Sequence, residues 1–136
     1  MVETMAEQQT PYEAVGGEET FFRLADAFYR GVESDPPLRE LYPPDLEGPR
    51  ERLALFLIQY FGGPHTYMEK RGHPRLRMRH MPYVIDQTQR DAWVTHMSAA
   101  VDEVGIAEPY RTDMLRYFGD AATFLMNADQ TQPHVH

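Results

Sequence analysis

The residues best suited to chemistry stand in the stretch from Gly72 to Pro82, which reads GHPRLRMRHMP. Five of the eleven residues from Lys70 to His80 are basic and none is acidic, whereas the remainder of the chain carries 8 basic and 21 acidic side chains. His80 ends a helix-sized segment between Pro74 and Pro82, where the freedom of its imidazole is limited. A histidine in such basic surroundings suits a metal centre whose other parts carry negative charge.

Two absences narrow the metal chemistry of His80. The chain has no cysteine, which excludes disulfides, iron–sulfur clusters, thiolate zinc sites and covalent haem attachment. The neighbours of His80 are Arg, Leu and Met rather than the carboxylates of a hard-metal cage, and no H-E-x-x-H motif occurs. One imidazole, an apolar core and nearby arginines suit a non-covalent haem with its two propionates. The alternative is an ordinary polar residue, which is the commoner fate of a lone histidine on an amphipathic segment.

The sequence is also rich in aromatic side chains that can form hydrogen bonds. They are Tyr29, Tyr42, Tyr60, Tyr67, Tyr83 and Trp93. The ordinary interpretation places such residues in the core with their polar ends toward solvent. Tyr29 and Trp93, however, stand on or beside the apolar faces of two separate predicted helices, where the hydroxyl and the indole N–H need partners. A diatomic ligand bound to iron would supply one.

Apolar periodicity predicts helices along the chain and no strand, so the fold class is all-α. The segment around 21–32 has apolar residues at the i, i+3, i+4 and i+7 spacing of one helix face. We expect further helical segments as a turn at 12–15, a short helix between a capping Asp35 and Tyr42, and a helix from Pro49 to Gly62. One or two helical turns at 66–71 and a short helix at 75–80 should follow. The capping box Asp86-Gln87-Thr88-Gln89 opens the next helix, which Gly105 closes, and a last helix begins at Pro109.

Length and composition indicate one domain with a normal core. We expect residues 1–10 to form a disordered arm, residues 11–128 the domain and residues 129–136 a flexible tail. The net charge of −8 argues against a general nucleic-acid binder. Charges interrupt the apolar runs before the roughly 20 residues that a membrane span needs. The acidic, polar N-terminus is unlike a targeting sequence, so we expect a cytoplasmic location.

Seven motifs spread over residues 11–128 form a specific combination. They are Tyr12-Glu13-Ala14-Val15-Gly16-Gly17, Phe28-Tyr29, Leu41-Tyr42-Pro43, Glu51-Arg52-Leu53, Gln59-Tyr60-Phe61-Gly62-Gly63-Pro64, Arg71-Gly72-His73-Pro74-Arg75-Leu76-Arg77-Met78-Arg79-His80 and Arg90-Asp91-Ala92-Trp93. The combination resembles that of the truncated haemoglobins of group II. The resemblance implies a shortened globin fold, in which two pairs of antiparallel helices form a two-over-two sandwich around haem b.

The resemblance also assigns roles to residues of this chain. His80 corresponds to the proximal ligand of the haem iron. Tyr29, Tyr42 and Trp93 match the three polar aromatic residues around the iron-bound ligand. Leu53 and Phe56 match apolar residues of the same pocket. The candidates for holding the propionates are Arg52, Tyr67, Arg77 and Arg79.

Two positions depart from the family pattern. Pro49 stands where other globins have a distal histidine and where group II commonly has a small residue. Proline has no N–H, so ligand stabilisation falls to the three polar aromatic residues. Tyr42 replaces the phenylalanine common in globins, which adds a further hydroxyl.

The resulting prediction is reversible binding or transport of dioxygen, with carbon monoxide, nitric oxide, peroxide and sulfide as further ligands. The alternative within the haem interpretation is a redox enzyme, a nitric oxide dioxygenase or a peroxidase-like protein. It would need an external reductase, because the chain has no flavin or nicotinamide domain. A separate alternative is a helical interaction module without haem, whose Lys70–His80 cluster binds an acidic partner or nucleic acid. The net negative charge opposes this last alternative.

Overall fold

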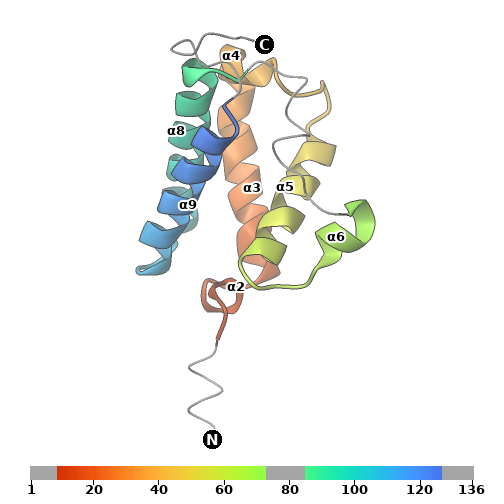
Figure 1. Ribbon diagram of the computed structural model, residues 1–136, viewed down its shortest axis with the longest axis vertical. Coiled ribbons are helices and arrows are strands. Elements are labelled where there is room, and N and C mark those ends of the chain that lie inside the picture. The colour runs from red at the N-terminus through yellow and green to blue at the C-terminus, as the bar shows by residue number, and fades with distance from the viewer. Residues whose placement is uncertain (1–8, 73–84, 127–136) are drawn as a thin grey trace, which may run out of the picture.

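The computed structural model describes residues 9–72 and 85–126, and these residues form helices and loops without a strand. The helices are α2 (Pro11–Ala14), α3 (Glu18–Glu33), α4 (Pro36–Arg39), α5 (Glu47–Tyr60), α6 (Thr66–Arg71), α8 (Gln87–Val104) and α9 (Tyr110–Phe124) (Figure 1). The all-α prediction is therefore confirmed. The short helix expected at 75–80 lies outside the described residues. Within the described ranges, no helix combines the length and apolar character that crossing a membrane requires.

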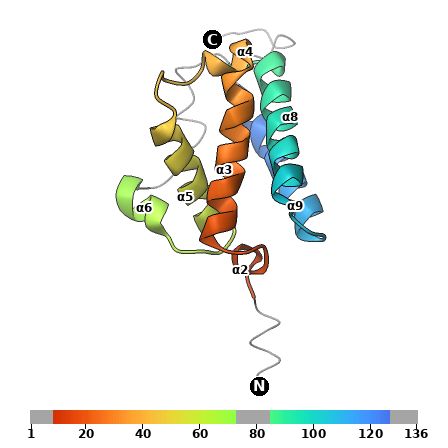
Figure 2. The ribbon, with the colours of Figure 1, turned by 180° about the vertical axis from the view of Figure 1, so that it is seen from behind.

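Helix α3 lies between α5 and α8, and α9 packs on α8 (Figures 1 and 2). Helix α3 can occupy this central place because every residue of its predicted apolar face is buried. Phe21, Leu24, Phe28 and Val32 have no exposed surface at all. Helices α8 and α9 also have buried apolar faces, which include Met97 of α8 and Phe118 of α9. Burial of these large side chains is the main force that holds the helices together.

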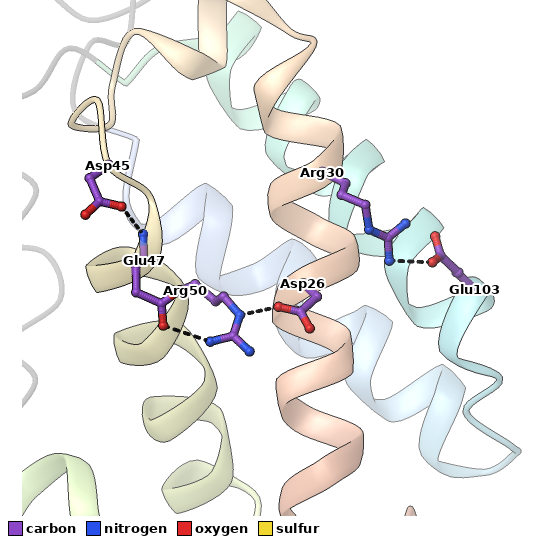
Figure 3. A network of polar contacts seen from close by, with 6 residues as sticks. All are labelled: Asp26, Arg30, Asp45, Glu47, Arg50 and Glu103. Carbon is purple, nitrogen blue, oxygen red and sulfur yellow. Dashed lines mark hydrogen bonds and ion pairs between the residues drawn. The ribbon is translucent and has the colours of Figure 1, made fainter.

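Ion pairs join the outer surfaces of the same helices (Figure 3). Arg50 of α5 pairs with Asp26 of α3 and, at 3.1 Å, with Glu47 in its own helix. On the other side of α3, Arg30 pairs with Glu103 of α8 at 2.6 Å. Exposed pairs of this kind contribute little to stability. They orient helices that the core already holds.

Two helix ends follow the predicted capping chemistry. The Asp86 carboxylate accepts hydrogen bonds from the backbone N–H groups of Thr88 and Gln89, and the backbone N–H of Asp86 donates to the side-chain oxygen of Gln89, which completes the capping box of α8. Gly105 ends this helix in the left-handed region, at φ 83°. Thr10, a residue of the predicted N-terminal arm, forms a capping box with α2.

The prediction that Asp35 caps the next helix is correct in position but wrong in chemistry. Asp35 precedes α4, yet its carboxylate makes no capping bond. Its Oδ2 instead lies 2.7 Å from Nε2 of His96 on α8. The first two residues of α4 are prolines, which have no N–H to offer, so the carboxylate is available to a distant helix. Asp35 therefore ties the start of α4 to α8.

Gly31 of α3 lies against His96 of α8. A Cβ added to this residue would overlap with Nδ1 of the His96 ring and lie 3.0 Å from its Cγ. The ring cannot move freely, because Asp35 holds its other nitrogen. Gly31 is thus a requirement of helix packing rather than of backbone conformation.

We predict that Gly31→Ala destabilises the protein. Alanine would normally favour a helix interior by about 1 kcal/mol over glycine, but overpacking against His96 should cost about 1–3 kcal/mol. Gly119→Ala is the matched control, because the nearest atom to its added Cβ is Nη2 of Arg90 at 4.0 Å. Urea unfolding of both variants gives the two free energies. Equal stabilisation of both variants would contradict the packing argument.

Candidate functional site

A cavity of about 560 Å³ opens between the helices, with walls from α3, α4, α5, α6, α8 and α9. Its size lies within the range of about 300–1,000 Å³ that small-molecule and cofactor sites occupy. Seven of the ten predicted site residues line it, namely Tyr29, Tyr42, Arg52, Leu53, Phe56, Tyr67 and Trp93. The other three, Arg77, Arg79 and His80, lie outside the described residues, and their roles stay predictions.

Three polar aromatic side chains meet on one wall of this cavity, although they come from different parts of the chain. Tyr29 belongs to α3, Tyr42 follows α4, and Trp93 belongs to α8. The Tyr29 and Tyr42 rings meet edge to face, with centroids 5.3 Å apart. Phe28 packs against this group, with its ring centroid 4.9 Å from that of Tyr29 and 5.4 Å from that of Trp93.

The position of Tyr42 depends on the chain that follows it. Pro43 and Pro44 prevent α4 from continuing, because proline cannot donate a helical hydrogen bond. The guanidinium of Arg39 then donates to the carbonyls of Tyr42, Pro43 and Pro44 at 3.2, 2.9 and 2.8 Å. One arginine thus holds three successive carbonyls and fixes the point at which Tyr42 enters the cavity.

The environment keeps both phenols protonated. Burial raises the pKa of Tyr29 far above its usual range, and the neighbouring Tyr42 raises it further, while the positive charge of Arg52 acts in the opposite direction. Burial also raises the pKa of Tyr42 to about 12, although polar interactions with Tyr29 and Trp93 favour its ionised form. At neutral pH the cavity wall therefore carries two hydroxyl groups and one indole N–H that can donate hydrogen bonds.

The remaining walls are mostly apolar. Leu53, Phe56 and Leu57 of α5 line the cavity, together with Phe118 of α9 and Leu125 at the end of that helix. Tyr67 of α6 is buried beside them, with its ring 5.6 Å from that of Phe56 and nearly perpendicular to it. These side chains suit a flat apolar ligand.

The charged residues on the cavity wall are Arg52, Arg71 and Arg90, and no carboxylate lines it within the described residues. Sequence reasoning missed Arg71 and Arg90. The second could have been found, because Arg90 stands three residues before Trp93 and therefore on the same face of a helix. Arg90 is held by the hydroxyl of Thr123 at 3.1 Å and the carboxylate of Asp91 at 3.1 Å.

Pro49 is buried and lines the cavity from the first turn of α5. The prediction that it would stand in the first turn is confirmed. Its ring offers no hydrogen-bond donor. The α5 side of the cavity therefore presents apolar surface at this position, and its one charged group is Arg52, one turn further along the helix.

The cavity fits the cofactor that the sequence suggests. Haem is a flat apolar ring with two carboxylates, and the cavity combines apolar walls with three arginines and no acid among its described lining residues. The polar aromatic cluster provides donors for a small molecule beside the ring. The arrangement agrees with non-covalent haem binding and with the chemistry of a gas ligand.

Comparison with known proteins places the chain in a family. A model of the family described as bacterial-like globin matches residues 10–127. Group 2 truncated hemoglobin YjbI of Bacillus subtilis (strain 168) is 38% identical over 122 residues, which cover 90% of this chain and 92% of that protein. The chain belongs to the bacterial-like globin family. Its resemblance to group II truncated haemoglobins is confirmed.

Solved structures agree with this placement. The hemoglobin of the thermophilic phototrophic bacterium Chloroflexus aurantiacus is 57% identical, with a TM-score of 0.87, over 88% of this chain and 99% of that one. The truncated oxygen-avid haemoglobin of Bacillus subtilis is 39% identical, with a TM-score of 0.84, over 88% of this chain and all of that one. The two-over-two globin fold is therefore confirmed, and haem b with its iron is the expected cofactor. Membership of the family implies binding of diatomic gases such as dioxygen.

Proposed function

We propose that this protein binds dioxygen reversibly at a haem iron held by His80, and that Tyr29, Tyr42 and Trp93 control its release. The observation that carries the proposal is the convergence of these three polar side chains on one cavity. They belong to segments far apart in the sequence, and their hydrogen-bonding groups meet beside apolar walls. Carbon monoxide and nitric oxide are ligands of the same kind. Peroxide and sulfide are further candidates.

Each residue has a distinct part in this proposal. Haem, when bound, would supply an iron atom that takes up a diatomic ligand, and His80 would hold that iron. Trp93 can only donate a hydrogen bond to that ligand, whereas Tyr29 and Tyr42 can donate or accept. Leu53 and Phe56 keep water from the ligand. Arg52, Tyr67, Arg77 and Arg79 are the candidates for the propionates.

The strength of the polar cluster suits slow release. One net hydrogen bond contributes about 0.5–1.5 kcal/mol, and more when the acceptor carries charge. Since about 1.4 kcal/mol corresponds to a factor of ten, two such bonds slow dissociation by roughly one to three orders of magnitude. Slow release favours a scavenger or a redox protein over a bulk carrier. The relative from Bacillus subtilis is described as oxygen-avid, which agrees with slow release of dioxygen.

The absorption spectrum tests haem binding directly. We expect the purified protein, after haem addition, to give a Soret band that shifts on reduction and again with dioxygen or carbon monoxide. His80→Gly should lose the native spectrum, and added imidazole should restore it, because free imidazole can replace the missing ligand. His65→Gly is the matched control, since this histidine is exposed at the start of α6. Absence of a Soret band in the native protein would refute the proposal.

Trp93→Phe should speed dioxygen dissociation about threefold to tenfold, the effect of one lost hydrogen bond. Phenylalanine keeps an aromatic ring between Phe28 and Phe118, which lie 5.4 and 5.9 Å from Trp93. Stopped-flow measurement of the off-rate checks this. Tyr117→Phe is the control, because it removes a hydroxyl from another cavity wall. An unchanged off-rate in Trp93→Phe would remove Trp93 from this role.

A second candidate function is peroxidase-like turnover with an external reductant. The favouring observation is an aromatic connection between the cavity and the surface. Tyr117 lines the cavity and stacks on Tyr60 with ring centroids 4.1 Å apart, and Tyr60 is 52% exposed. In this reaction one hydrogen peroxide takes up two electrons and two protons and gives two waters. A phenolic donor at the surface supplies both electrons and protons.

If Tyr60 passes electrons from such a donor, Tyr60→Phe should slow peroxide-dependent oxidation of a bulky phenol several-fold, because phenylalanine is much harder to oxidise. Tyr110→Phe is the matched control, since Tyr110 does not line the cavity. The oxidised phenol is followed by absorbance. No turnover in the native protein would exclude this function, and equal rates in the two variants would exclude Tyr60 from it.

A further inference from the structure

Two aromatic side chains that line the cavity also pack against Tyr60, the last residue of α5. Tyr117 of α9 stacks on the Tyr60 ring, with centroids 4.1 Å apart and 23° between the ring planes. Phe56 lies one helical turn before Tyr60, with its ring centroid 6.3 Å away. Tyr60 does not itself line the cavity. It is separated from the cavity by a single layer of aromatic rings.

Tyr60 differs from the other tyrosines in its exposure to solvent. It is 52% exposed, whereas every other tyrosine in the described part of the chain is buried or half-buried. A single exposed aromatic residue is common on protein surfaces and needs no functional explanation. Tyr60 is distinguished by the stacked partner beneath it, because Tyr117 reaches the cavity. The pair therefore connects the cavity with the surrounding water through two phenol rings.

The two stacked phenols differ in how readily they release a proton. Burial raises the pKa of Tyr117 well above its usual range, and the neighbouring Tyr60 raises it further. Oxidation of a phenol to a neutral radical removes one electron and one proton, and burial leaves Tyr117 with less water to receive that proton. Tyr60 is exposed to water that can accept it. An oxidation that begins in the cavity should therefore end on Tyr60.

We propose that Tyr60 is an oxidative modification site, at which hydrogen peroxide joins two copies of this protein by a covalent bond between their Tyr60 rings. Each phenol gives up one electron and one proton, a carbon–carbon bond forms between the rings, and the displaced ring hydrogens move to the phenol oxygens. One hydrogen peroxide takes up the two electrons and two protons, its O–O bond breaks, and two waters form. The inference rests on the peroxidase-like function proposed above.

The test follows the covalent dimer in haem-loaded protein that is treated with hydrogen peroxide without an added phenol. We expect a dimer band on a denaturing gel, together with the fluorescence of dityrosine, and a yield that falls on dilution because two copies must meet. Tyr60→Phe should lose both signals, since phenylalanine cannot form a phenoxyl radical. Tyr117→Phe should lower the yield several-fold, because the stacked phenol between the cavity and Tyr60 is lost.

Tyr110→Phe is the matched control and should dimerise like the native protein, because Tyr110 is half-buried and does not line the cavity. A dimer that persists in Tyr60→Phe would overturn the proposal. Dityrosine fluorescence that stays with the monomer would also overturn it, since the bond would then lie within one chain. Native protein that oxidises an added phenol but forms no dimer would overturn this inference alone, whereas native protein that does neither would refute the peroxidase-like function as well.

Discussion

The site depends on one packing contact, the burial of Phe28 between α3 and α8. This ring has no exposed surface, and it touches both Tyr29 and Trp93, two of the three polar aromatic residues. Because the interior is close-packed, neither neighbour can move without opening a void. The hydroxyl and the indole N–H are therefore held in place by apolar contacts that take no part in ligand chemistry. Rigid donors of this kind need little reorganisation when a ligand arrives.

Burial of polar aromatic rings leaves their hydroxyl and N–H groups in need of hydrogen-bond partners. The three residues of the cluster supply such partners to one another. Taken from water, the phenols of Tyr29 and Tyr42 resist ionisation, and their pKa values rise. They remain neutral donors, and they interact with each other and with Trp93 rather than with a distant polar group. The same low dielectric that raises these pKa values strengthens any hydrogen bond to a partly negative ligand. Stability and ligand chemistry thus use the same feature of the core.

The sequence predicted best what is decided by neighbouring residues. The apolar face of α3 and the capping box at Asp86 need only contacts within a few positions, and both were correct. Asp35 was misjudged because its partner, His96, lies 61 residues away. The cavity lining by Arg71 and Tyr117 likewise depends on how helices pack. Motif resemblance named seven residues that share the cavity, which periodicity alone could not bring together.

The spacing on α5 suggests why Pro49 is tolerated. Pro49 and Arg52 are three residues apart and line the same cavity, so they share one face of the helix. Proline in the first turn costs little, because an N–H there has no helical partner. What it removes is a side-chain donor close to the ligand. The guanidinium of Arg52 folds back toward Gly48, where an added Cβ would lie 3.0 Å from its Nη1. Gly48 thus gives the guanidinium room at the start of α5, where Pro49 contributes only apolar surface.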